Sequence, residues 1–558
     1  MRASFDGFRF LRNGENCSAR DGRAGAVLMA SATYDALNKA WNSTCRVIFG
    51  QETAPLSDCA EWLREYDLLL RQEKSAVSGK TVTLSLDDYA DGAAFIAFDE
   101  ISFGKKFEPL SINEMKDIDS VVEAMRERAQ YAGSVVLGHS SGVERSNNVI
   151  DSHFVLESSM VNDSKYVGFS RYVGYGEYCF GLFGAESDTH CVKCHGSELK
   201  RCFECHMVEL LSDCYYCARV QNSHDCMLCF GLENGAYAVG NTVLPKEKYL
   251  QIKAKLLQEI AGRIRKDGKV FSLLELIERS SEYETDPRLK FAKEKRLPFD
   301  IAPIDKAFGK TCSLLFGRDI GSVEKYADFL YRHVPKNVML RSQLSGEVTN
   351  VCGYRAHLLE RYNLGKRMAT EEEMRSIGRM GGLCDLENLS SDLGSLVEKL
   401  HPVAYTNLDK VSGKVANYLD SPVIIDSVDC CHGSAFINSK KCAWCFWPSQ
   451  SEAVFGSGPI FNSSYCMKCF YSKNMQRSFE CDNCRSCADS YFLHNCENVR
   501  DSMFCFNAKN LNNAIGNAPL ATEVYRKTKA ALVSQMANEL ERTKNLKWDI
   551  FSIGAGAQ

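Results

Sequence analysis

The chain has 558 residues, enough for about two to four ordinary domains. Its 45% hydrophobic and 25% charged residues are typical of a soluble globular protein, and a net charge of −4 gives no electrostatic case for nucleic-acid binding. No apolar run approaches the roughly 18 residues of a membrane span, so no membrane association is expected.

The first residues, MRASFDGFRF, lack the apolar core of a signal peptide. We therefore expect a chain that is not secreted by a signal peptide and that resides in the cytoplasm or within an assembled virus particle. In such surroundings its 26 cysteines are expected to be reduced thiols, buried or bound to metal.

Residues 1–135 are predicted to form a head of mixed α/β structure. The segments 79–86 and 93–98 contain the β-branched and aromatic residues that are typical of strands. The segment 111–129 has the hydrophobic spacing of a helix.

Residues 136–243 are rich in cysteine, and CxxC pairs recur there every twelve residues after one step of eleven. The cysteines of these pairs are Cys191, Cys194, Cys202, Cys205, Cys214, Cys217, Cys226 and Cys229. The segment is full of Ser, Asn, Asp, Gly, Cys and aromatic residues, which favour short strands and turns over helices. A fixed short period in this composition predicts a β-solenoid with one rung per repeat. Rungs about 4.8 Å apart stack like side chains into columns, and so thin a tube is expected to hold only small side chains such as Cys, Ser, Val, Ala and Gly.

Residues 244–276 are predicted to close this solenoid with a capping helix and a linker. An apolar stripe at helical spacing follows Pro245, which suits a first helical turn. The stripe consists of Tyr249, Ile252, Leu256, Ile260 and Ile264. A helix laid over the last rung would cover an open sheet end.

The second half of the chain repeats words of the first half in the same order. "AVGN" at 238–241 recurs as "AIGN" at 514–517, a shift of 276, and "TCRVIFG" at 44–50 recurs as "TCSLLFG" at 311–317, a shift of 267. This indicates an internal duplication of a unit of roughly 270 residues. We therefore expect a second head at 277–415 with a helix at 370–380, a second Cys-rich solenoid at 416–519, and a second capping helix with a tail at 520–558. The predicted fold class is α+β.

The CxxC pairs at 191–229 also allow a metal-binding interpretation. Zinc takes four ligands in a tetrahedron, often from two CxxC pairs, so the eight cysteines named above are the candidate metal ligands. The second half of the chain argues against metal binding. Ser478, Ser490 and Ser502 stand there at the repeat positions that cysteines occupy in the first half. Serine is a poor zinc ligand but an acceptable core residue. Core filling is therefore favoured, with metal ligation, disulfides or redox chemistry as alternatives. No cofactor is expected unless zinc binds here.

No catalytic or cofactor-binding residue is predicted. The neighbours Cys194-His195 and Cys205-His206 have only the composition of a nucleophile with a base, and their imidazoles are expected outside the rung corners. The segment GYGEYCFGLFG at 174–184 lacks GxGxxG, which excludes the nucleotide-binding motif.

The segment CDNCRSCADSYFLHNCENVRDSMFCFNAKNLNNAIGN (481–517), with EVYRKTKAAL after it, resembles Cys-rich repeat proteins of environmental microbial and phage genomes. Residues 229–241 resemble them too, so that the resemblance covers the two solenoids and their tails. It implies an architecture similar to that of β-solenoids with twelve-residue rungs, and it implies no activity and no functional residues. The leading hypothesis is a non-enzymatic structural or interaction protein with protein partners, such as a phage-particle component. The alternative is a zinc- or thiol-based module or enzyme centred on the CxxC pairs.

Overall fold

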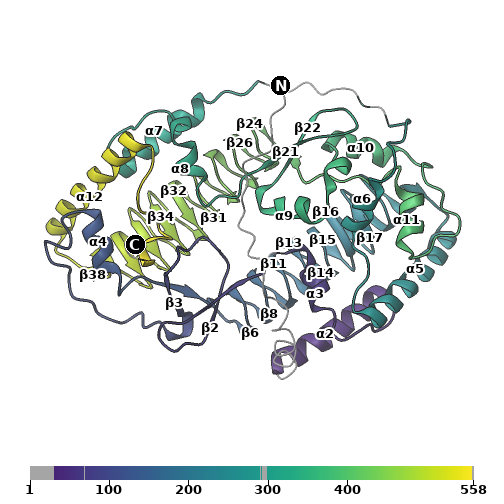
Figure 1. Cartoon of the computed structure of the whole chain (residues 1–558), viewed down its shortest axis with the longest axis horizontal. Helices are drawn as coiled ribbons and strands as arrows, with labels where there is room; N and C mark the ends of the chain where they lie inside the picture. The colour runs from purple at the N-terminus through teal and green to yellow at the C-terminus, as the bar shows by residue number, and fades with distance from the viewer. Residues whose placement is uncertain (1–30, 68, 290, 292–297, 556–558) are drawn as a thin grey trace.

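The computed structural model describes residues 31–67, 69–289, 291 and 298–555. Two long stacks of parallel strands, each flanked by helices, make up most of this part, so the fold is α+β (Figure 1). The N-terminal residues MRASFDGFRF, which are expected not to form a signal peptide, lie outside the described residues, as does Cys17. In the described part, no helix is both long enough and apolar enough to cross a membrane.

The first stack lies within Val136–Val243. Its strands are β5 (Val136–Leu137), β6 (Ser141–Glu144), β7 (Asn147–Ile150), β8 (His153–Leu156), β9 (Ser159–Asn162), β10 (Lys165–Gly168), β11 (Arg171–Gly174), β12 (Glu177–Phe180), β13 (Phe183–Glu186), β14 (Thr189–Val192), β15 (His195–Lys200), β16 (Phe203–Ser212), β17 (Tyr215–Ala218), β18 (Gln221–Met227), β19 (Ala236–Val239) and β20 (Thr242–Val243).

The second stack lies within Lys410–Pro519. Its strands are β23 (Lys410–Ser412), β24 (Ala416–Leu419), β25 (Val423–Ile425), β26 (Val428–Cys431), β27 (Phe436–Ile437), β28 (Lys440–Ala443), β29 (Pro448–Ser449), β30 (Glu452–Phe455), β31 (Ile460–Phe461), β32 (Ser464–Phe470), β33 (Ser472–Lys473), β34 (Phe479–Asp482), β35 (Tyr491–His494), β36 (Arg500–Phe506), β37 (Asn512–Ile515) and β38 (Ala518–Pro519).

Pairing within both stacks is almost entirely parallel and mostly joins residues that are twelve positions apart, although β5 with β7 and β23 with β25 are paired at a spacing of thirteen. Val167 of β10 lies beside Val155 and Cys179, and in the second stack Cys430 lies beside Cys442. One step of eleven pairs His195 with His206. Each stack ends in a short antiparallel strand, β20 or β38, after a tight turn.

In the regular parts of both stacks, every third residue faces the interior. Ser146, Val149 and Ser152 show the pattern, being at most 2% exposed, and the residue before each has a left-handed backbone with φ of 45–54°. The expectation that only small side chains fit inside is wrong. Leu182, Phe436 and Met475 are fully buried within the stacks, because four inward positions per twelve residues leave room for a large side chain beside small ones.

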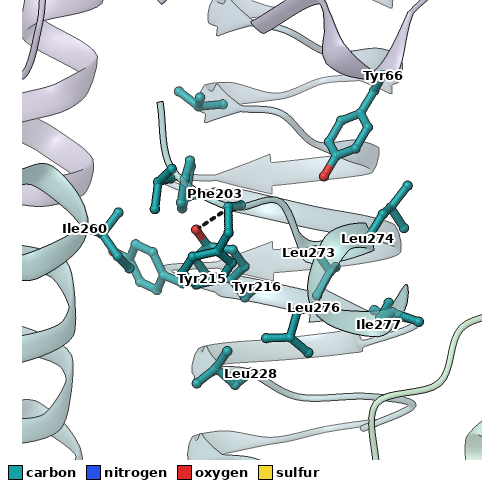
Figure 2. Packing of buried hydrophobic residues seen from close by; sticks show 14 of the residues in the cluster. Tyr66, Phe203, Tyr215, Tyr216, Leu228, Ile260, Leu273, Leu274, Leu276 and Ile277 are labelled. Atoms are coloured by element: carbon teal, nitrogen blue, oxygen red, sulfur yellow. Dashed lines mark hydrogen bonds between the residues drawn. The ribbon is translucent and has the colours of Figure 1, made fainter. Parts of the chain in front are cut away.

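Helices surround the first stack. From the first half come α2 (Ala32–Phe49), α3 (Ala60–Leu63), α5 (Lys246–Asp267) and α6 (Leu273–Ser280); from the second half come α9 (Ala356–Arg361), α10 (Glu371–Arg379) and α11 (Leu393–Leu400). Their apolar residues form one continuous core with the outer face of the stack. Figure 2 shows part of it, where Leu273, Leu276 and Ile277 of α6 pack beside Tyr216.

The second stack is covered in the corresponding way. From the second half come α7 (Ala302–Phe316), α8 (Ala327–Tyr331) and α12 (Thr522–Thr543); from the first half come β2 (Thr81–Leu84), β3 (Ala94–Ala97), β4 (Gln130–Gly133) and α4 (Ile118–Met125). Strand β1 (Arg71–Lys74) pairs with β2, and β21 (Val338–Arg341) pairs with β22 (Val348–Val351).

Each head is thus divided between the two stacks. In the first head, α2 and α3 pack on the first stack, whereas β2, β3, β4 and α4 pack on the second. In the second head, α7 and α8 pack on the second stack, whereas α9, α10 and α11, which we call its crossing segment, pack on the first (Figure 1). The crossing segment of the second head makes a very close contact: a Cβ on Gly378 of α10 would lie 1.9 Å from the carbonyl oxygen of Gly231. The stacks also touch directly, with the ring of Tyr172 5.0 Å from that of Trp447.

The predicted local elements are mostly present. Strands β2 and β3 lie within 79–86 and 93–98, and α10 lies within 370–380. The helix predicted over 111–129 is shorter and spans only Ile118–Met125, because Asp117 caps its start through the amide of Ser120. The tail helices α5 and α12 each contain 22 residues.

Candidate functional site

The structure places the eight cysteines predicted as metal ligands inside the first stack. Each is at most 1% exposed, and all are free thiols. Their Sγ–H groups donate to backbone carbonyls, as from Cys205 to Cys214 at 3.4 Å. Across residues 31–67, 69–289, 291 and 298–555, no three or more His, Cys, Asp or Glu side chains form a group that could hold a metal ion.

The pKa values of these thiols depend on burial and on their neighbours. Burial raises the pKa of Cys191, Cys205 and Cys229 well above its usual range, which keeps them protonated and unreactive. At Cys226, hydrogen bonds from Cys214 and Cys229 outweigh burial and lower the pKa to about 5.

The histidines beside the CxxC pairs lie on the outer surface of the stack, as expected, but His206 is buried there. It is 2% exposed, lies beside His195 in the neighbouring rung, and packs edge-on against the ring of Tyr66 at 4.4 Å. His224 is exposed and its ring packs edge-on against that of Tyr237. The three imidazoles therefore do not join the cysteines.

A buried group of polar residues lies between the first stack and α3, and we call it the first cluster: Lys193, Glu204, Glu65, Tyr66 and Trp62. The Nζ of Lys193 is 3.1 Å from Glu204, pairs with Glu65, and lies 4.8 Å from the centre of the Trp62 ring. The hydroxyl of Tyr66 donates to Glu204, and in Figure 2 it points toward the stack. Lys193 and Glu204 are fully buried, and burial raises the pKa of Glu204 to about 7.

The second stack carries a second cluster: Lys468, Glu480, His333, Asp88 and Asp549. Lys468 lies 3.7 Å from Glu480 and 4.8 Å from the centre of the Phe329 ring. The Nδ1 and Nε2 of His333 face Asp88 at 2.9 Å and Asp549 at 3.0 Å. Burial lowers the pKa of His333, but the hydrogen bonds to these two carboxylates outweigh it and raise the pKa, which favours the doubly protonated ring.

The two clusters occupy corresponding positions. Glu480 follows Glu204 by 276 residues, and Phe329 and His333 follow Trp62 and Tyr66 by 267. Glu204 accepts from the amide of Leu273 at 2.9 Å and Glu480 from that of Ile550 at 3.0 Å. Each carboxylate thereby ties its stack to the segment after the tail helix.

Each cluster places a buried lysine next to a carboxylate and an aromatic face, so that charge inside the protein is paired. Sequence reasoning missed them. The available signal was the occurrence of Lys and Glu one rung apart at the same place in both halves, Lys193 with Glu204 and Lys468 with Glu480.

Two surface hollows lie along the second stack. One, of about 560 Å³, is polar and is lined by Asp426, Asn438, Gln450 and Asn462 at successive rungs. The other, of about 450 Å³, lies between β35, β36 and α12 and contains Tyr491, Asp501, Tyr525 and Lys529. Lys529 donates to Asp501 at 3.3 Å, as Lys253 does to Asp225 in the first half at 3.0 Å.

Comparison with known proteins adds no relative. No protein-family model matches the chain, and no curated protein or solved structure matches it either.

Proposed function

We propose that the chain is a non-enzymatic structural or interaction protein, built from two tandem β-solenoids with twelve-residue rungs that arose by internal duplication. It serves as a component of a larger assembly, such as a phage particle, and its partners are proteins. The parallel pairing at twelve-residue intervals in both stacks and the two corresponding buried clusters support this proposal.

The observation that carries the proposal is the difference between the two ends of each stack. At the C-terminal end, the antiparallel strand and a tail helix close the stack, as where the ring of Tyr249 of α5 packs against Tyr237 of β19. At the N-terminal end, β6 pairs only with β8 and β24 only with β26 among the strands of the described part. An edge strand of this kind is a template for pairing with another chain.

Strand β24 has the more apolar edge. Tyr418 and Leu419 are each 40% exposed there, whereas β6 carries Ser141 and Glu144. Apolar side chains on an exposed edge favour pairing, and charged ones oppose it. We therefore place the first assembly contact at β24, with a second copy of the chain as the partner to test.

We expect the purified full chain to sediment in analytical ultracentrifugation as a species larger than one chain, and the variant Leu419→Lys to shift it toward the single chain. Lysine at an edge opposes strand pairing through its charge and its hydration. Leu210→Lys is the matched control, because Leu210 is 47% exposed on the side of the first stack, away from either edge. A chain that sediments singly at every concentration, or equal losses in the two variants, contradicts the proposed contact.

The alternative is a zinc- or thiol-based module at the CxxC pairs of 191–229. The lowered pKa of Cys226 favours it, because the thiolate is both the metal ligand and the nucleophile. A thiolate in a closed apolar column has no route to a substrate, however, and burial opposes its charge. The structural function is therefore the one we favour.

A further inference from the structure

The side chains of Lys193 and Glu204 meet in the first cluster, and both are fully buried. The Nζ of Lys193 lies 3.1 Å from the Oε1 of Glu204, and this oxygen has no hydrogen-bond partner among the described residues. The rings of Trp62 and Tyr66 cover the amine, with their centres 4.8 and 4.3 Å from Nζ. A primary amine and a carboxyl group are thus held side by side behind aromatic walls.

The two oxygens of Glu204 have different surroundings. Oε2 accepts from the hydroxyl of Tyr66 and from the amide of Leu273 at 2.9 Å. Two donors at one carboxyl oxygen stabilise the negative charge that develops there when a nucleophile adds to the carbon. Oε1, which lies next to Lys193, is then the oxygen that can leave. Burial raises the pKa of Glu204 to about 7, so that a substantial fraction of it is the neutral acid at neutral pH.

A second carboxyl group, that of Glu65, contacts the same amine. Glu65 belongs to the 3-10 helix η1 (Arg64–Tyr66), and its Oε2 accepts from the Nζ of Lys193. Burial raises the pKa of Glu65, but Lys193 outweighs burial and lowers this pKa. Glu65 is therefore ionised and suited to accept a proton, whereas the neutral acid form of Glu204 is the better electrophile.

We propose that Lys193 and Glu204 join in an intramolecular amide bond, with Glu65 as the base. The reacting forms are the neutral amine and the neutral acid. The bond between Nζ and Cδ forms as the amine adds to the carboxyl carbon, and Glu65 takes one proton from Nζ. The bond between Cδ and Oε1 then breaks, and Oε1 leaves as water with its own proton and the proton that Glu65 returns. Oε2 becomes the amide oxygen and keeps its two donors.

Folding supplies this reaction with the conditions that a free amine and a free acid lack in water. Both groups are fixed on adjacent rungs, so the reaction is intramolecular and the effective concentration of the amine is high. The amide also replaces a buried ion pair, whose removal from water is costly. No oxidant, cofactor or further reactant is required. The product ties two rungs of the first stack together covalently, and this inference does not depend on the assembly contact proposed at β24.

The second cluster offers an internal comparison. Lys468 lies 3.7 Å from the Oε1 of Glu480. Position 332, which corresponds to Glu65 at the shift of 267, holds an arginine. The Nζ of Lys468 donates to the backbone carbonyls of Phe329 at 3.2 Å and Arg332 at 3.4 Å. Because no carboxylate stands in the place of Glu65, we expect no bond between Lys468 and Glu480, and finding one would contradict the role given to Glu65.

The mass of the unfolded full chain tests the proposal. We expect it to be lower than the mass of the sequence by one water. Trypsin should release the peptide that contains Glu204 joined to a peptide in which Lys193 is uncleaved, because Lys200 and Arg201 separate the two sites. A mass equal to that of the sequence would overturn the proposal, and so would a crosslink from Lys193 to Glu65.

Three variants assign the roles. Lys193→Met keeps the length of the side chain and removes the amine, so its mass should equal that of its sequence. Glu65→Gln removes the base, which is expected to slow the reaction about 10²- to 10⁴-fold. Lys468→Met is the matched control, because it removes the buried lysine of the second cluster and should keep the loss of one water. Loss of water in Lys193→Met would overturn the proposal, and the peptide map of the wild type decides the question if a variant fails to fold.

Discussion

Replacing Gly378 with alanine is expected to lower the free energy of unfolding by about 3 kcal/mol, near the upper end of the usual cost of overpacking. The new Cβ would lie 1.9 Å from the carbonyl oxygen of Gly231 and 2.8 Å from the amide nitrogen of Leu232. Both are backbone atoms of the first stack, so α10 has to move away from it. Chemical denaturation of the wild type and the variant measures the difference.

Gly262→Ala is the matched control, because Gly262 lies in the interior of helix α5 and its Cβ would meet no atom within 4 Å. Alanine stabilises a helix interior by about 0.5–1 kcal/mol relative to glycine. The two substitutions are therefore expected to change the free energy of unfolding in opposite directions. Stabilisation by Gly378→Ala as well would show that the crossing segment does not pack on the first stack in this way.

Replacing Glu480 with glutamine is expected to remove part of the pH dependence of stability. Glu480 is fully buried, and burial raises its pKa from 4.5 to about 7 although Lys468 opposes the shift. Between these two values the folded chain holds a proton that the unfolded chain has released. The contribution of this carboxyl to the free energy of unfolding is therefore fully present below pH 4.5 and falls by about 3 kcal/mol as the pH rises through 7.

The measurement is the free energy of unfolding of wild type and Glu480→Gln from pH 4.5 to 8. We expect the difference between the two proteins to change with pH in that window, with the wild type losing stability relative to the variant. Comparing the two removes the contributions of the other titrating groups, such as His333. Glu497→Gln, at a carboxylate 49% exposed beside Lys509, is the matched control for the same substitution at the surface. If Glu480→Gln runs parallel to the wild type, burial does not raise the pKa of Glu480 in the folded protein, which contradicts this prediction.

Local sequence patterns predicted the local structure well. The β-branched and aromatic residues at 79–86 and 93–98 and the apolar stripe after Pro245 act through neighbours in the chain, and β2, β3 and α5 are present there. The many parallel strands and the abundance of cysteine also agree with the prediction of a Cys-rich β structure. The roles proposed for the CxxC pairs, structural or metal-binding, stay predictions.

Contacts between distant segments could not be predicted. Nothing in the residues around Arg355 indicates that they pack on the stack of the other half, because such a contact depends on how the whole chain is arranged. The first and second clusters also combine residues more than 100 positions apart, such as Glu65 with Lys193 and Asp88 with His333. The period of three inside each rung is present in the sequence at Ser146, Val149 and Ser152, but the cysteine spacing of twelve is the stronger signal.

The CxxC cysteines of the first stack and most cysteines of the second stack lie in the packed interiors of the stacks. Measuring metal content and thiol reactivity on the same native full-length sample tests whether they act there as packing residues. We expect no stoichiometric metal and protected thiols in the native protein, and all 26 cysteines should react after unfolding. One or more zinc or iron atoms per chain, lost when Cys214 and Cys217 are changed to serine, would contradict this expectation.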